Sequence, residues 1–174
     1  TIRRATGRPY FVGPLARVSL NRDRLSPRAR RVADDIGLDA TCRNPFKSLL
    51  ARGLEVIHAY EEALSILSAY RPARPPRVKY EYRNGAGAAV TEAPRGMLYH
   101  RYEIGDDGLV RLAKIVPPTS QNQAQIEDDL RHYAPQLGDD DGRVTAGCEH
   151  LVRSYDPCIS CSTHFLRVTI ERTP

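Results

Sequence analysis

The spacing of hydrophobic and polar positions in the first seventy residues predicts helices. Apolar residues follow helical spacing from the start signal Ser26-Pro27 to a stop at Gly37. A second start signal, Asn44-Pro45, opens an apolar period that continues for about seven turns to Tyr70. This pattern predicts a long core helix that ends before the proline-rich stretch at residues 71–76.

The pattern then changes to one typical of strands. We expect strands over Val78–Tyr82, Met97–Ile104 and Leu109–Val116, with a hairpin turn at residues 105–108, Gly-Asp-Asp-Gly. The glycine-rich stretch at residues 85–89 lacks the strand-to-helix context of a nucleotide-binding loop.

Helices return after the predicted sheet. Thr119 or Ser120 could cap a helix after a pair of prolines, and an acidic loop at residues 138–142 leads to a last helix that contains Cys148. Long helices around a small antiparallel sheet indicate one α+β domain that covers residues 1–174.

Composition excludes several classes of protein. At 41% hydrophobic and 27% charged residues the chain is typical of soluble proteins, and no apolar run is long enough for membrane insertion. The net charge of +5 comes with scattered arginines and no recognition motif, which favours solvated surface or a contact with a neighbouring chain over nucleic acid. Four cysteines are too few for a disulfide scaffold, and we expect a reducing compartment, the cytoplasm.

The candidate chemistry lies near the end of the chain, in Cys158-x-x-Cys161-x-x-His164. Asp156 and Pro157 fit the cap and first position of a helix, which would put the two cysteines one turn apart on one face. A helix N-terminus favours the thiolate, the form that binds metals. The segment therefore predicts a metal site.

Spacing alone leaves three kinds of site open. One is a zinc or iron site completed by Cys148 or His150, and this spacing is common for zinc. Another is a redox pair, which would need a βαβ context that the pattern does not show. The third is a soft transition-metal site whose other ligands lie elsewhere.

Motifs upstream of this segment narrow the choice among these kinds of site. Glu92–His100 (EAPRGMLYH), Ile115–Asn122 (IVPPTSQN) and Asp156–His164 occur in this order, after Val12–Arg17 (VGPLAR) and a helix around Ala51–Glu55. Together they resemble the C-terminal half of the large subunit of nickel-iron hydrogenases. The likeness is greatest to the cytoplasmic types linked to NAD(P) or to cofactor F420.

The resemblance implies a set of metal ligands. In that family four cysteines hold nickel, and two of them bridge to an iron that carries cyanide and carbon monoxide. Cys158 would be a terminal nickel ligand and Cys161 a bridging one. His164 and the carbonyl of Ile115 would bind a magnesium or iron ion beside the active site.

The resemblance also implies roles around the metals. Arg95 would stand over them and donate to a cyanide, Thr119 would donate to the other cyanide, and Asp156 would be the acidic group near Arg95. A dry pocket around the carbon monoxide would be lined by Pro94, Leu98 and Pro118. Heterolytic cleavage of hydrogen needs a Lewis-acid metal and a nearby base, for which a terminal thiolate and Arg95 are both candidates.

The chain departs from the family in lacking the other cysteine pair, an Arg-x-Cys-Gly-x-x-Cys motif. Cys42 and Cys148 match no ligand position and are predicted to be small buried residues. We therefore expect a C-terminal domain that is empty of metal and inactive alone, with residues 165–174 as an uncleaved tail. Its expected partners are the N-terminal part of the same subunit, an iron-sulfur small subunit, a maturation protease, nickel chaperones and H2.

Two other functions compete with this one. A binding or assembly module could hold a structural zinc at Cys158 and Cys161. A degenerate hydrogenase-like subunit of a proton-pumping complex is disfavoured, because such relatives lose the cysteine pair that this chain keeps.

Overall fold

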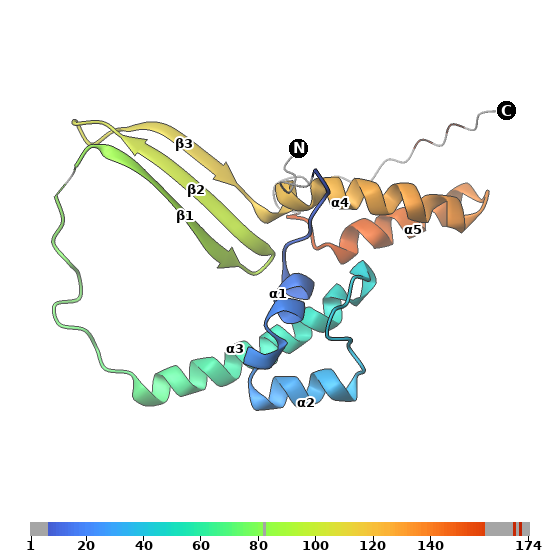
Figure 1. Ribbon diagram of the computed structural model, residues 1–174, viewed down its shortest axis with the longest axis horizontal. Coiled ribbons are helices and arrows are strands. Elements are labelled where there is room, and N and C mark those ends of the chain that lie inside the picture. Colours follow the sequence, from blue (N-terminus) through green and yellow to red (C-terminus); the bar gives the residue numbers. More distant parts are fainter. Residues whose placement is uncertain (1–6, 82, 159–168, 170, 172–174) are drawn as a thin grey trace.

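The fold consists of helices, a three-stranded sheet and helices again, as Figure 1 shows. The computed structural model describes residues 7–81, 83–158, 169 and 171. The first helices are α1 (Pro14–Leu20), the 3-10 turn η1 (Arg22–Arg24), α2 (Pro27–Asp35), η2 (Pro45–Lys47) and α3 (Ser48–Ala69). They are followed by β1 (Gly85–Ala93), β2 (Gly96–Ile104), β3 (Val110–Val116), α4 (Pro118–Tyr133), η3 (Ala134–Leu137) and α5 (Asp141–Ser154). The predicted α+β class is confirmed.

The first core forms where α1 and α2 pack on the N-terminal half of α3. Its buried residues are Leu15, Val18, Leu25, Ala29, Ala33, Leu38, Cys42, Ala51 and Leu54. The Asn44 side chain accepts from the Phe46 amide at 3.0 Å, which confirms the start signal before α3. Ser26 precedes α2 as predicted but makes no side-chain cap, and its amide donates to His58 Nδ1 at 3.2 Å. This bond ties α2 to α3.

Helix α3 is only half a core helix, which corrects the expectation from its apolar period. Ala51 and Leu54 are 0% and 1% exposed, whereas Tyr60 and Leu67 are 71% and 68% exposed. The reason is that α1 and α2 lie against the first turns of α3, and the second half projects away from them (Figure 1). The apolar face of the second half of α3 is therefore not packed against α1 or α2.

The sheet has the order β1-β2-β3 and is antiparallel throughout. The predicted turn at residues 105–108 is confirmed, with the Gly108 amide donating to the Gly105 carbonyl at 2.9 Å. The first strand, however, is β1 at residues 85–93 rather than 78–82, so that prediction was wrong. The position of the first strand is set by its pairing with β2. A tight turn pairs Ala93 with Gly96, and this register puts residues 85–93 opposite β2.

The second core joins α4, η3 and α5 around the buried residues Leu137, Val144 and Cys148. Cys148 and Cys42 are both buried, as predicted, and burial raises the pKa of the Cys148 thiol. Asp140 caps α5 by accepting from the Arg143 amide at 2.6 Å. Helix α4 starts at Pro118, with Pro117 at the cap position, so Thr119 and Ser120 lie in its first turn and neither is its cap.

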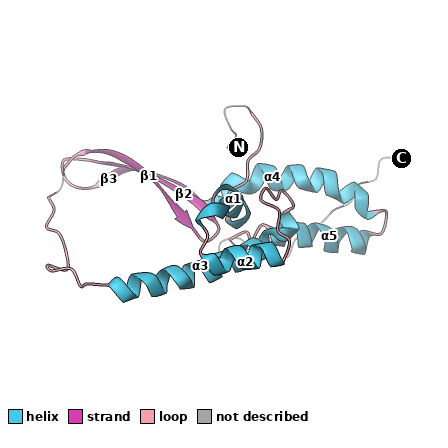
Figure 2. Cartoon of the chain, turned by 60° about the horizontal axis from the view of Figure 1, so that its bottom comes forward, coloured by secondary structure: helices cyan, strands magenta, loops and turns pink. Residues whose placement is uncertain are grey.

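Figure 2 shows the sheet extending away from the helical part of the molecule. None of the helices in the described residues combines the length and the apolar character needed to cross a membrane.

Candidate active site

The turn between β1 and β2 carries Arg95 and lies against the segment that enters α1. Gly96 has a φ of 135°, and a Cβ there would come within 2.8 Å of Val12 Cγ2. Gly13 has a φ of 123°, and a Cβ there would lie 2.9 Å from the Arg95 carbonyl oxygen. Only glycine tolerates both the backbone conformation and this close approach at the two positions. The glycines therefore let the chain near residue 12 pack directly on the Arg95 turn.

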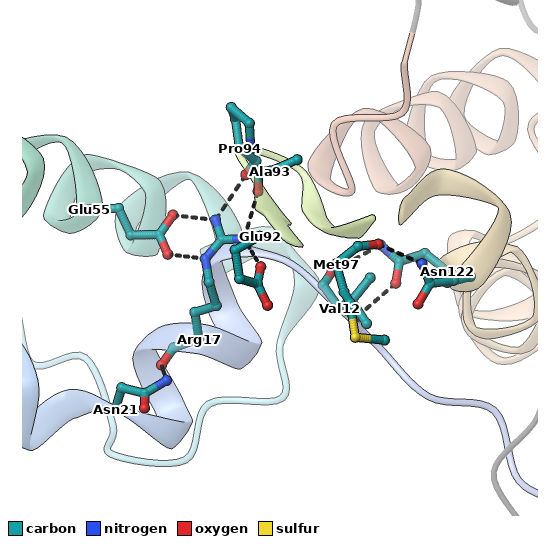
Figure 3. Close-up of polar contacts among 10 residues, drawn as sticks. Val12, Arg17, Asn21, Glu55, Glu92, Ala93, Pro94, Met97 and Asn122 are labelled. Carbon is teal, nitrogen blue, oxygen red and sulfur yellow. Dashed lines mark hydrogen bonds and ion pairs between the residues drawn. The ribbon is translucent and has the colours of Figure 1, made fainter. Parts of the chain in front are cut away.

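Two buried amides in the first turns of α4 fix these segments. Asn122 Oδ1 accepts from the Val12 amide at 2.8 Å, and its Nδ2 donates to the Val12 carbonyl at 3.0 Å (Figure 3). Gln121 Nε2 donates to the carbonyls of Met97 and Val116 at 2.6 and 3.2 Å. Gln121 and Asn122 are each 2% exposed. Gln121 Oε1 also accepts from the Tyr10 hydroxyl at 3.1 Å. Buried amides whose partners are mostly backbone groups fix the register of the segments that they join.

The charged part of the site is a carboxylate shared by two arginines. Arg95 Nε lies 3.1 Å from the Asp156 carbonyl oxygen and 3.2 Å from its Oδ2. Arg52 Nη1 on α3 lies 2.7 Å from the same Oδ2. Asp156 has a φ of 48°, in the left-handed region that Asp enters more readily than most residues. This backbone conformation turns the chain after α5 so that one carboxylate meets guanidinium groups from two other elements.

Cys158 follows two residues later and contacts the start of α4. Its amide donates to Thr119 Oγ1 at 3.2 Å, and the residue is half-buried. Neither Pro157 nor Cys158 is helical, in contrast to the predicted helical turn. Cys161 and His164, and the rest of that predicted helix, lie outside the described residues.

The remaining predicted site residues in the described chain are on β2, in the turn before it and on β3. Leu98 is half-buried on β2. Pro94 is exposed, and it lines a hollow of about 480 Å³ together with Arg17 and Glu55. Ile115 lies on β3 opposite His100, and its side chain is 52% exposed. In the described chain Pro94, the residue expected in a dry pocket, therefore faces open space.

Three contributors to the site received no role from the sequence alone: Arg52, Gln121 and Asn122. The sequence distinguishes these residues only weakly. Arg52 is one of many arginines, and polar residues such as Gln121 and Asn122 near the start of a helix are ordinarily solvated. Both amides directly follow the Pro-Pro-Thr-Ser stretch, so position in a motif was the one usable clue.

A metal at Cys158 would find only part of its ligand set in the described residues. Within residues 7–81 and 83–158, no three His, Cys, Asp or Glu side chains gather where they could hold an ion. Cys158 supplies a thiol, and the Asp156 carboxylate is already held by two arginines. This donor chemistry fits a share of a thiolate-bound metal centre, with the other ligands outside the described residues.

The family model described as nickel-dependent hydrogenase matches residues 3–164. The chain belongs to this family. The resemblance of the Arg95, Thr119 and Cys158 motifs to a hydrogenase large subunit is thereby confirmed.

Relatives of this chain include subunits of sulfhydrogenases and of NAD-reducing hydrogenases. It is 38% identical over 167 residues to the sulfhydrogenase 1 subunit alpha of Pyrococcus furiosus, covering 93% of this chain and 38% of that protein. It is 30% identical over 165 residues to the NAD-reducing hydrogenase HoxS subunit beta of Cupriavidus necator, covering 89% of this chain and 34% of that subunit.

Solved hydrogenases share the fold as well. An NAD+-reducing [NiFe]-hydrogenase in the H2-reduced state superposes with a TM-score of 0.73 at 28% identity, over 92% of this chain and 37% of that one. A nickel-iron-selenium hydrogenase from Desulfomicrobium baculatum gives a TM-score of 0.65 at 28% identity, over 92% and 36% of the two chains. The chain thus spans less than two fifths of the length of each of these three relatives.

Proposed function

We propose that this chain is the C-terminal part of a nickel-iron hydrogenase large subunit, and that it contributes half of the centre for reversible H2 oxidation and proton reduction. The observation that carries the proposal is the meeting of three distant motifs. Arg95 from the β1–β2 turn contacts Asp156 at 3.1 and 3.2 Å, and Cys158 contacts Thr119 at 3.2 Å.

The metal ligands follow from the family pattern. Cys158 and Cys161 would hold nickel, with Cys161 bridging to an iron that carries cyanide and carbon monoxide. His164 and the Ile115 carbonyl would hold a magnesium-type ion. When bound, the nickel-iron centre supplies the Lewis acid needed to polarise H2.

Arg95 is the residue proposed to act closest to hydrogen. Asp156 occupies its Nε, so the terminal amino groups of Arg95 are the donors that it would direct toward the metals. A guanidinium held this way keeps its direction, which would suit donation to a cyanide. Arg52 would keep Asp156 in place, because it binds the same carboxylate oxygen.

Thr119 and the apolar residues would complete the pocket. Thr119 Oγ1 accepts from the Cys158 amide, and a hydroxyl that accepts still has one proton to donate, here to the second cyanide. Pro94, Leu98 and Pro118 would exclude water around the carbon monoxide once the exposed Pro94 is covered. A dry surrounding strengthens each of these hydrogen bonds.

Exposed apolar surface supports a larger assembly. The second half of α3 exposes Tyr60, Leu64, Ile66 and Leu67, and its C-cap is Tyr70; each of these side chains is more than three-fifths exposed. The chain also spans less than two fifths of its relatives, so the N-terminal part of the same subunit is the proposed cover for this face.

The other proposed partners are an iron-sulfur small subunit that carries electrons, a maturation protease and nickel chaperones, all in the cytoplasm. Residues 165–174 would be the tail that the protease removes. The chain alone would be inactive, because two thiols cannot hold the whole centre.

Metal analysis of the complete protein, as its gene encodes it, tests the proposal. Cys158→Ser should abolish bound nickel and H2 uptake, while Cys148→Ala, at a buried cysteine of the second core, should retain both. Stoichiometric zinc without nickel in the wild-type protein would instead favour the zinc-holding module. Hydrogen uptake by the isolated 174-residue chain would contradict its proposed inactivity.

A further inference from the structure

Arg17 on α1 directs all five N–H groups of its guanidinium at neighbouring oxygens (Figure 3). Nε and Nη2 donate to the two carboxylate oxygens of Glu55 at 2.6 and 2.8 Å. Nη1 donates to Glu92 Oε2 at 2.7 Å and to the Ala93 carbonyl at 2.8 Å. Nη2 also donates to the Pro94 carbonyl at 2.9 Å.

These contacts join three elements at one side chain. Glu55 belongs to α3, and Glu92 with the two carbonyls belongs to the end of β1 and the turn after it. The Glu55 pair is bidentate and half-buried, with side-chain exposures of 21% for Arg17 and 22% for Glu55. Hydrogen bonding to Glu55 raises the pKa of Arg17, although burial opposes this, so the charge stays constant with pH.

The two carbonyls belong to the residues immediately before Arg95. A guanidinium that binds two consecutive carbonyls restrains the orientation of both peptide planes. The backbone direction at the next residue, Arg95, is thereby restrained as well. On the other side of the turn, Gly13 and Gly96 allow backbone contact. The Arg95 turn is therefore held on one side by backbone packing and on the other by Arg17.

We propose that Arg17 is a positioning residue, which fixes the backbone at residues 93 and 94 and thereby aims Arg95 at Asp156. Its functional meaning rests on the proposed role of Arg95 at the hydrogen site. Lysine would keep the charge but has three donors from one nitrogen, so it cannot serve two carboxylates and two carbonyls together.

Hydrogen–deuterium exchange in the complete protein tests the restraint without requiring activity. In Arg17→Lys, amides of the segment at residues 93–98 should exchange about tenfold faster than in wild type. Arg22→Lys is the control, because Arg22 has a similar side-chain exposure of 22% and also binds carboxylate and carbonyl oxygens, those of Asp34 and Leu38, away from the turn. Unchanged exchange in Arg17→Lys would overturn the proposal.

A double-mutant cycle in the metal-loaded enzyme tests the path through Arg95. Arg17→Lys should lower kcat for H2 about tenfold and leave KM within about twofold, while Arg22→Lys changes neither. In an Arg95→Lys background, Arg17→Lys should have no further effect, because it acts through the replaced side chain. If Arg17→Lys lowers kcat by the same factor in the Arg95→Lys background as in wild type, the proposal is overturned.

The experiments distinguish failure of the proposed function from failure of the proposed role of Arg17. If Arg95→Lys leaves H2 turnover unchanged, the role of Arg95 is wrong, whereas the exchange experiment still decides whether Arg17 restrains the turn. Should Arg17→Lys fail to fold, Glu92→Ala serves instead, since Glu92 is 57% exposed and its loss frees one Nη1 contact. It should raise exchange in the same segment by about twofold to threefold, and no rise would count against the proposal.

Discussion

Arg52 on α3 binds the carboxylate of Asp156 at 2.7 Å, and so ties the buried half of the long helix to the segment that carries Cys158. Ala51 and Leu54, at 0% and 1% exposure, set the rotation of α3 on either side of Arg52. Packing of the first core thereby decides where this guanidinium lies.

Replacing Arg52 should weaken the attachment of the Asp156 segment. We expect Arg52→Ala to lower the free energy of unfolding by about 1 kcal/mol, because both partners are about two-thirds buried and a charged hydrogen bond is lost. The denaturant midpoint of the complete protein measures this. Arg153→Ala is the control, since Arg153 forms a surface pair with Glu149 and should change stability by less than about 0.5 kcal/mol. Equal effects would contradict a special role for Arg52.

Replacing Asn122 should lower the free energy of unfolding far more than replacing Gln123, its neighbour on the exposed side of α4. Asn122→Ala leaves both the Val12 amide and the Val12 carbonyl without partners, which should cost about 2–3 kcal/mol. Gln123→Ala removes only an exposed contact with Glu127 and should stay within about 0.5 kcal/mol of wild type. Chemical denaturation of both variants gives the comparison, and a mild Asn122→Ala would show that water replaces the amide.

Two glycine-to-alanine changes should have opposite signs. Gly96→Ala should destabilise the protein by about 2–4 kcal/mol, because the new Cβ meets Val12 Cγ2 at 2.8 Å at a φ of 135°. Gly53→Ala lies inside α3 with nothing within 4 Å, so it should raise stability by about 0.5–1 kcal/mol. Thermal midpoints of the two variants check both signs, and a neutral Gly96→Ala would mean that the Arg95 turn can shift.

Tyr155 should make stability depend on pH in the alkaline range. Burial first, and then the hydrogen bond from its hydroxyl to Asp129, raises the pKa of Tyr155 well above the ordinary value of 10.0. Its neutral form is favoured on folding, so its contribution is fully present below about pH 10. As pH rises beyond that, only the unfolded chain ionises and stability falls by about 1.4 kcal/mol per pH unit.

Tyr155→Phe should therefore flatten the alkaline dependence and lower stability at neutral pH by about 1 kcal/mol. The control is Tyr60→Phe, at a side chain 71% exposed, which should leave the alkaline slope unchanged. Denaturant midpoints between pH 8 and 11 measure the slopes. Parallel profiles for wild type and Tyr155→Phe would contradict the assignment.

Local patterns predicted most elements of the fold. Start signals at Ser26-Pro27 and Asn44-Pro45 and the turn at residues 105–108 each depend on a few neighbouring residues, and all three lie where expected. The first strand was misplaced, because pairing with β2 decides it and no local signal reports a partner. The second half of α3 was expected in a core, since an apolar period shows which face seeks cover but not what covers it.

Within the site, the sequence by itself determined the chemistry: a cysteine pair, an arginine in a tight turn, and the family to which they belong. The family resemblance already implied that Asp156 lies near Arg95. Only the tertiary structure decided that Arg52 binds the same carboxylate, and that Arg17 holds the turn before Arg95. The physical reason is separation along the chain. Arginines are alike in sequence, and only the packing of α1, α3 and the hairpin selects which carboxylate and which carbonyls each one reaches.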